Sequence, residues 1–285
     1  WLRLLIMPLF VQAQTLSTPF EADNNCSAAY HEAIAFYQQL QAAYPKQVQV
    51  TANGLTEAGL PLHTVVLDHH GHFTPEQIRA DNKVIILINN GIHPGEPCGV
   101  DASMMLIRDY LEKRLDNSYL EQVSLVIIPL YNIGGSLNRG SYSRANQQGP
   151  AYYGFRGNAK NLDLNRDFIK ADSHNARSMN RLFSYWQPHI FIDNHTSNGA
   201  DYPYSITLIP TQHNKLQPIL ADFMQQEMLP YLFTAMKQRN WEMTPYVYAR
   251  TTPDEGISGF LDLPRYSSGY AALHNAISFM PETHL

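Results

Sequence analysis

The chain has 285 residues, of which 44% are hydrophobic and 16% charged. It can therefore bury a substantial core, and nothing in it has the composition of a disordered segment. The formal net charge of −5 and the absence of any run of Lys or Arg argue against a nucleic-acid partner. Length alone fits one large domain or two small ones, but without a linker, repeat or low-complexity segment one domain is the simpler interpretation.

The amino-terminal residues have the pattern of a secretory signal peptide. Arg3 precedes an apolar stretch over 4–11, and Val11-Gln12-Ala13 provides small residues for cleavage. We expect residues 1–13 to be the signal peptide, too short to span a bilayer, and 14–285 to form a secreted or periplasmic domain without stable membrane insertion. A buried amino-terminal element is the alternative. Export would permit a disulfide, but Cys26 and Cys98 could equally stay free.

Apolar strands alternate with amphipathic helices along the chain. The sequence predicts helices over 24–44, 99–113, 172–186 and 216–238, and strands over 47–52, 62–67, 83–89, 124–130, 189–193, 205–209 and 276–280. A turn around Asn53-Gly54 and Gly59 should join the first two strands, and Pro218 and Pro230 should limit or kink the last helix. A long loop is expected over 132–161. This order predicts an α/β fold: a single domain with a mixed, largely parallel central sheet covered by helices on both faces.

Potential metal ligands follow two of the predicted strands. The loop after KVIILIN contains His93 and Glu96, stiffened by Pro94 and Pro97, and His195 ends the strand HIFIDNH. Imidazole and carboxylate groups are suitable zinc ligands, and the carboxyl ends of strands in an open α/β sheet usually carry the ligand site. A His-x-x-Glu pair is common by chance, but three ligands at two strand ends would leave a fourth position open for water, as in catalytic zinc sites.

A longer motif lies between these ligands. His-x-x-Glu is followed by R-x-N-A-x-x-x-D-L-N-R-D-F over 156–168, then by a strand ending in His and by a late Glu. From about residue 87 to the carboxyl end, this order resembles the M14 zinc carboxypeptidases. The resemblance implies an enzyme, a metallocarboxypeptidase that uses one Zn²⁺ ion and water to remove the terminal residue from a peptide with a free C-terminal carboxylate.

The resemblance also implies roles for individual residues. His93, Glu96 and His195 would bind Zn²⁺, Arg156 would stabilise the developing oxyanion, and Asn165 with Arg166 would bind the substrate carboxylate. Glu282 would be the general base, with its pKa raised by partial desolvation. A substrate-binding tyrosine could be either Tyr266 or Tyr270. The chain departs from the family at Pro97, where an aromatic residue is common, and at Leu285, where a closing helix is missing; we therefore expect a fragment truncated at the carboxyl end.

Two other functions remain possible from the sequence. One is an M14-like amidase or deacylase acting on cell-wall peptide or an acylated amino acid, and the other is a non-catalytic peptide-binding module. Two smaller features also have open interpretations. Asp68-His69-His70-Gly71-His72 could bind a metal but is interpreted as a solvated hairpin loop. Asp193 is expected to alternate away from His195 on the strand, and either orients a ligand or pairs with a surface cation.

Overall fold

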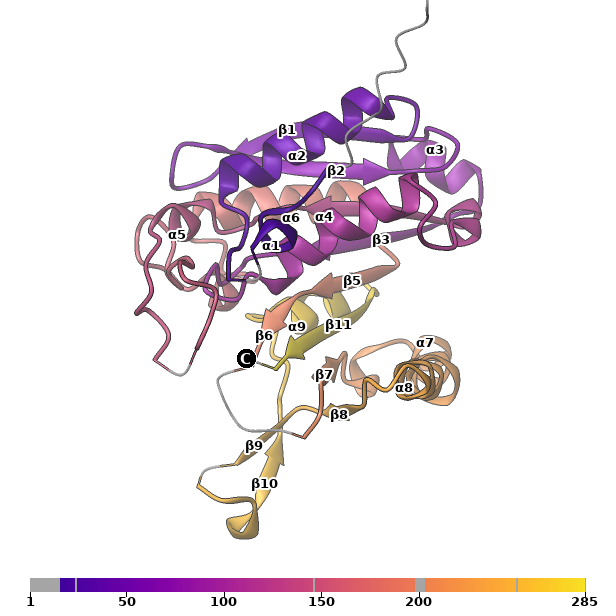
Figure 1. Cartoon of the computed structure of the whole chain (residues 1–285). Coiled ribbons are helices and arrows are strands. Elements are labelled where there is room, and N and C mark those ends of the chain that lie inside the picture. The colour runs from indigo at the N-terminus through magenta and orange to yellow at the C-terminus, as the bar shows by residue number, and fades with distance from the viewer. Residues whose placement is uncertain (1–15, 24, 146, 198–202, 250, 285) are drawn as a thin grey trace, which may run out of the picture.

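The computed structural model describes residues 16–284 except 24, 146, 198–202 and 250. The predicted signal peptide and Leu285 lie outside the described residues. A mixed, nine-stranded sheet crosses the described part of the chain in the order β1-β2-β4-β3-β5-β11-β7-β8, with β6 paired to β11 (Figure 1). Its strands are β1 Val48–Leu55, β2 Pro61–Leu67, β3 Val84–Asn89, β4 Val123–Ile128, β5 Ile190–Asp193, β6 His195–Thr196, β7 Ile206–Pro210, β8 Met243–Pro245 and β11 Ile277–Thr283. The expected α/β class is confirmed.

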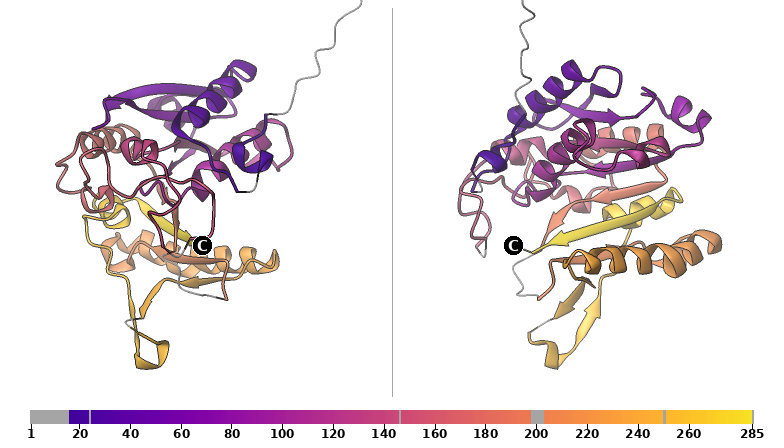
Figure 2. Two further views of the ribbon diagram at one scale, coloured as in Figure 1. Left: turned by 60° about the vertical axis from the view of Figure 1, so that its left-hand side comes forward. Right: turned by 45° about the vertical axis from the view of Figure 1, so that its right-hand side comes forward.

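The central strands are buried on both faces, which explains their continuous apolar sequences. In β3, Ile88 packs into one core, whereas Ile85 and Leu87 pack into another on the opposite face. Helices α2 (Tyr30–Ala43) and α4 (Cys98–Leu111) cover the first face. The second face is covered by α3 (Pro75–Ala80), α6 (His174–Trp186) and α9 (Ser267–Leu273). The views of Figure 2 show helices on either side of the twisted sheet.

The segment predicted as one helix over 216–238 is limited and interrupted near its two prolines. Pro218 begins α7 (Pro218–Phe223), a π-helical turn (η4, Met224–Met228) follows, and α8 runs over Leu229–Gln238. Pro230 donates no backbone hydrogen bond, and its ring crowds the carbonyl four residues earlier, so the chain widens before it. Apolar side chains of this segment pack with Leu208 and Phe279 in a third core.

Several local predictions were wrong. Of the predicted turn, Asn53-Gly54 lies within β1, at a register irregularity, whereas Gly59, where φ is +72°, does lie in the turn to β2 as expected. The long loop expected over 132–161 contains one short helix, α5 (Ile133–Leu137), and an isolated bridge from Gly140 to Tyr153. Besides α3 and α9, the sequence analysis missed the short helical segments α1 (Pro19–Ala22), η1 (Ser118–Glu121) and η2 (Leu164–Arg166). It also missed η3 (His213–Lys215), η5 (Pro253–Glu255) and the pair β9 (Val247–Ala249) and β10 (Ile257–Gly259), which projects from the body (Figures 1 and 2).

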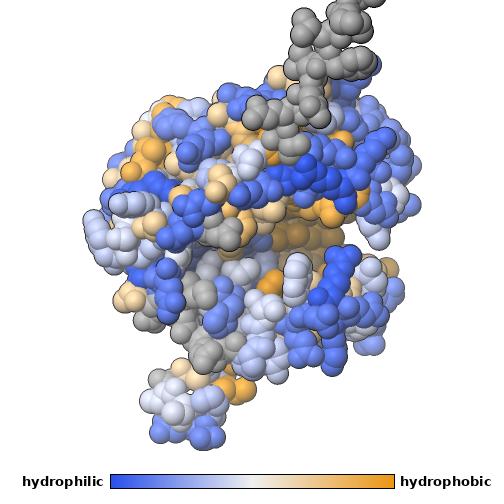
Figure 3. Space-filling view, in the orientation of Figure 1, coloured by the Kyte–Doolittle hydropathy of each residue, from blue (hydrophilic) through white to orange (hydrophobic). Residues whose placement is uncertain are grey.

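The surface and the cysteines add little constraint on function. Figure 3 shows a mostly hydrophilic outer face, broken by a hollow with a hydrophobic floor between α4 and α8. Cys26 is exposed and Cys98 half-buried, and both are free thiols. None of the helices in the described residues is long and apolar enough to cross a membrane.

Candidate active site

Four of the predicted site residues meet at the carboxyl ends of three neighbouring strands. His93 and Glu96 lie in the loop after β3, and His195 lies on β6, which continues the line of β5. Glu282 lies on β11, where its Cα is directly paired with that of His195. Parallel pairing of β3, β5 and β11 places their carboxyl ends at one edge, so the topology itself brings these segments together.

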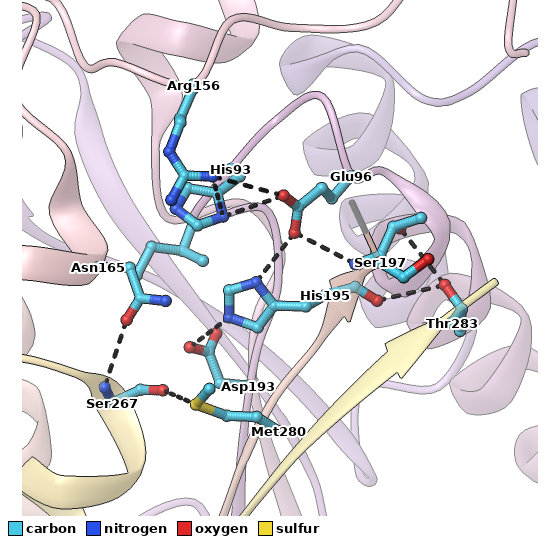
Figure 4. Close-up of polar contacts among 12 residues, drawn as sticks. His93, Glu96, Arg156, Asn165, Asp193, His195, Ser197, Ser267, Met280 and Thr283 are labelled. Carbon is cyan, nitrogen blue, oxygen red and sulfur yellow. Dashed lines mark hydrogen bonds and ion pairs between the residues drawn. The ribbon is translucent and has the colours of Figure 1, made fainter. Parts of the chain in front are cut away.

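The three proposed metal ligands form a compact, buried group (Figure 4). His93 Nδ1 lies 3.1 Å from Glu96 Oε1, and His195 Nδ1 lies 2.9 Å from Glu96 Oε2. One ligand atom from each side chain lies within 4.8 Å of those of the other two. The relative exposure of the three residues is only 2–4%. The three residues that the sequence analysis grouped as metal ligands therefore do lie together in the structure.

Hydrogen bonds on the outer side of each ring favour a cation between these ligands. His93 Nε2 faces Asp163 Oδ1 at 3.2 Å, and His195 Nε2 faces Asp193 Oδ2 at 3.0 Å. Carboxylates only accept, so each Nε2 carries a hydrogen, and in the neutral form of each ring the lone pair of Nδ1 points towards a Glu96 oxygen. Lone pairs about 3 Å apart repel unless a proton or metal ion lies between them. Two imidazoles and one carboxylate are a donor set of catalytic zinc, so the residues present fit that ion.

The charge balance of the buried group supports the same conclusion. Burial alone would disfavour the ionised Glu96, but His93 and His195 outweigh it and hold the pKa of Glu96 well below its usual range. Burial would likewise lower the pKa of His195, but the carboxylates of Asp193 and Glu96 raise it well above its usual value. The group therefore attracts positive charge despite its burial.

Asp193 corrects one detail of the sequence analysis. It does not point away from His195, because residues two apart on a strand share a face. Its other oxygen, Oδ1, accepts a hydrogen bond of 2.8 Å from Asn89 Nδ2, which fixes the carboxylate that holds His195. Of the two roles considered, Asp193 has the orienting one.

Arg156 is held beside the same group by Asp163. Arg156 Nε donates to Asp163 Oδ2 at 3.0 Å, and its Nη1 lies 3.3 Å from His93 Nδ1. Burial would raise the pKa of Asp163, but the hydrogen bond from His93 and the charges of Arg156 and Arg166 lower it. Asp163 was quoted in the sequence motif without a role, and its place three residues before an arginine was the only signal. It links a proposed ligand, His93, to the proposed oxyanion-stabilising Arg156.

Asn165 and Arg166 lie on the short turn η2, which Asp163 caps by accepting the backbone N–H of Asn165 at 2.9 Å. Asn165 is buried, and its Oδ1 accepts from the backbone of Ser267 at 3.4 Å. The Arg166 guanidinium lies 4.6 Å from the centre of the Tyr266 ring. That stacking directs a partly exposed cation into the pocket.

The two candidate tyrosines have different surroundings. Tyr266 lines the pocket, whereas Tyr270 packs among core rings, 5.5 Å from Phe168 and 5.3 Å from Phe183 between ring centres. This placement argues against the substrate-binding role considered for Tyr270. Tyr246 and Tyr248, which the sequence analysis did not select, also line the pocket.

Glu282 has the electrostatic character expected of a base. Burial raises the pKa of its carboxyl to about 7, and the carboxylate of Glu96 adds to this, although the charge of His195 opposes it. Glu282 shares one pocket of about 220 Å³ with the three proposed ligands and with Arg156, Asn165 and Arg166. A carboxyl group that titrates near neutrality can accept and return a proton at ordinary pH.

Arg144 is a pocket residue that the sequence analysis missed. It projects from the long loop after α5, and its Nη1 donates to Glu96 Oε1 at 2.6 Å while Nη2 donates to the carbonyl oxygen of Ser197 at 2.7 Å. The loop approaches so closely that a Cβ on Gly95 would lie 2.8 Å from Arg144 Cδ. No local motif marks Arg144, because its contacts depend on tertiary folding.

Comparisons with known proteins bear on the family and the fold. A family model described as zinc carboxypeptidase, peptidase M14, matches residues 33–270. The probable carboxypeptidase 2 of Arthroderma benhamiae is 26% identical over 117 residues, which cover 41% of this chain and 19% of that protein. The metallo-carboxypeptidase of Burkholderia cenocepacia superposes with a TM-score of 0.65 at 18% identity, covering 90% of this chain and 60% of that one. Carboxypeptidase A of Helicoverpa armigera gives 0.67 at 15% identity, with coverages of 96% and 68%.

Proposed function

Because the chain belongs to the zinc carboxypeptidase family, whose fold supports a metallopeptidase, we propose that it removes the C-terminal residue from peptides that end in a free carboxylate. One observation carries this proposal: Asn165 and Arg166 share a single pocket with His93, Glu96 and His195. An arginine fork pairs with a carboxylate through two parallel hydrogen bonds and keeps its charge at all working pH values. The terminal carboxylate would thus place the last peptide bond beside the ligand group.

His93, Glu96 and His195 would hold Zn²⁺, which supplies Lewis acidity to a carbonyl oxygen and acidifies bound water. Arg156, fixed by Asp163, would present a positive charge to the oxygen of the scissile carbonyl as negative charge develops on it. Glu282 would accept the proton of the attacking water and return it to the leaving nitrogen. The pocket's aromatic residues, Tyr246, Tyr248, Phe260 and Tyr266, would contact the terminal side chain. The amino-terminal pattern adds the proposal that the enzyme is secreted or periplasmic.

The proposal is tested with peptides that differ only in their last residue, each as the free acid and as the amide. We expect cleavage of the free acids, abolished by a chelator and restored by Zn²⁺, and little cleavage of the amides. Arg166→Ala should lower kcat/KM for the acids roughly 10- to 100-fold, because a hydrogen bond to a charged group contributes about 1.5–3 kcal/mol.

The exposed Arg239→Ala is the matched control and should behave as the unmodified protein. Equal rates on acid and amide, unchanged by Arg166→Ala, would exclude a terminal-carboxylate substrate. They would favour instead the amidase or deacylase chemistry considered from the sequence.

A further inference from the structure

A second group of metal-ligating side chains lies at the opposite edge of the sheet. His69, His70 and His72 follow β2, Asp81 directly follows α3, and Glu121 ends η1, next to the start of β4. This edge holds the amino ends of β3 and β4, whereas the candidate active site lies at the carboxyl end of β3. In Figure 1 α3 lies at the right-hand end of the sheet and β6 at the other end. The predicted solvated hairpin loop is thus a strand-to-helix connection with partners from two other elements.

A buried aspartate fixes the conformation of this connection. Asp68 Oδ1 accepts the backbone N–H groups of His70 and His72 at 2.8 and 2.9 Å. Its Oδ2 accepts from Lys83 Nζ and Ser124 Oγ, both at 2.5 Å. At Gly71 the φ angle is +79°, and a Cβ would lie 2.6 Å from the carbonyl oxygen of Lys46. The histidines are therefore held in place before any ligand binds.

The histidine rings converge on the two carboxylates. His69 Nε2 and His70 Nε2 lie 3.0 and 3.1 Å from the two oxygens of Glu121. On its other side, His70 Nδ1 lies 2.8 Å from Asp81 Oδ2, and His72 Nδ1 lies 3.5 Å from the same oxygen. The ligand atoms of His69, His70 and Glu121 all lie within 4.8 Å of one another. The geometry is that of a three-ligand cation site that is open to solvent.

The hydrogen-bonding geometry of His70 leaves a place for a cation. A neutral imidazole has one N–H, yet both nitrogens of His70 face carboxylate oxygens. If Nδ1–H donates to Asp81, the lone pair of Nε2 faces Glu121 and requires either a second proton or a metal ion. A carboxylate that accepts from the outer nitrogen of a metal-bound histidine is a common arrangement around zinc. Lys83, the nearby buried cation, is already paired with Asp68.

We propose that His69, His70 and Glu121 bind a divalent transition-metal ion of the Zn²⁺ class, with Asp81 orienting His70. Two imidazoles and a carboxylate suit Zn²⁺, Cu²⁺ or Ni²⁺ better than Ca²⁺ or Mg²⁺. The ion would link the segment between β2 and α3 to η1 and would stabilise this edge of the sheet. It would be separate from the ion of the candidate active site, whose ligands come from other strand ends.

The test uses the full chain with the active-site ligands removed by His93→Ala and His195→Ala. Zn²⁺ is titrated calorimetrically into this variant, and its thermal unfolding is followed with and without Zn²⁺. We expect about one remaining equivalent of bound Zn²⁺ and a rise in unfolding temperature on its addition, because binding to the folded state alone stabilises it. Adding His70→Ala, or Glu121→Gln, should weaken this binding at least tenfold and remove the rise.

The exposed His213→Ala, added to the same background, is the control and should leave binding unchanged. Unfolding without metal shows whether each variant is folded. If the background variant takes up no Zn²⁺, His70 carries a second proton instead and the proposal is wrong. Uptake that survives both His70→Ala and Glu121→Gln would place the ion elsewhere and also overturn it.

Discussion

Glu282→Gln is expected to lower kcat about 10²- to 10⁴-fold, the usual contribution of a positioned proton-transfer group. Glutamine keeps the size of the side chain but cannot accept a proton. The proposed ligands are held by other residues: His93 by Asp163, Glu96 by Arg144 and His195 by Asp193. The substitution should therefore leave the metal content and KM nearly unchanged. Steady-state kinetics and elemental analysis of the same preparation measure both quantities. Full activity in this variant would exclude the role proposed for Glu282.

The pH profile gives a second measure of the same residue. A general base acts only when deprotonated, so kcat/KM should fall as the pH falls through its pKa. Burial raises the pKa of Glu282 to about 7 from an ordinary 4.5, and a divalent cation nearby would favour the ionised form. The midpoint of the acid limb should therefore lie between these two values. The limb should be missing from the residual activity of Glu282→Gln and retained in the exposed Glu227→Gln, with metal content measured at each pH.

The central sheet and the ligand group were predictable because each leaves a mark in the local sequence. Strands buried on both faces read as continuous apolar runs, and β3 and β4 fit that pattern. Parallel strands end at one edge, so polar side chains that follow them converge without further information. For this reason His93, Glu96 and His195 could be grouped from residues about a hundred positions apart.

The missing details depend on contacts that no local pattern encodes. Arg144 reaches Glu96 from an irregular loop, and its role depends on where that loop folds. Tyr266 and Tyr270 occupy almost the same place in the sequence, but Tyr270 lies on α9 and turns into the core between Phe168 and Phe183. The β2–α3 connection likewise becomes a candidate metal site only through Asp81 and Glu121, which its own sequence does not contain.

Lys83→Met is expected to reduce the free energy of unfolding by about 3–5 kcal/mol at pH 8, the usual cost of removing one partner of a buried ion pair. The side chains of Lys83 and Asp68 are only 1% and 0% exposed. Methionine matches the length of lysine, so packing is largely kept while the carboxylate of Asp68 loses its counter-charge. Chemical denaturation of the two proteins measures the difference. The loss of stability should be accompanied by weaker Zn²⁺ binding at His70, because Asp68 holds the β2–α3 connection, which carries His70, in place.

The sign of the pH dependence separates lost charge pairing from lost packing. Burial opposes ionisation of Asp68, but Lys83 and Ser124 outweigh it and lower its pKa in the unmodified protein. Without Lys83, burial should raise the folded-state pKa above the unfolded one, so that the folded state binds the extra proton and regains stability as the pH falls. The cost of Lys83→Met should therefore shrink between pH 8 and pH 5. Lys237, 75% exposed and 3.4 Å from Glu242, provides the control: Lys237→Met should change stability by less than about 1 kcal/mol at either pH. If the two substitutions cost the same, or the cost at Lys83 does not depend on pH, the buried pair does not stabilise this edge of the sheet by the mechanism argued above.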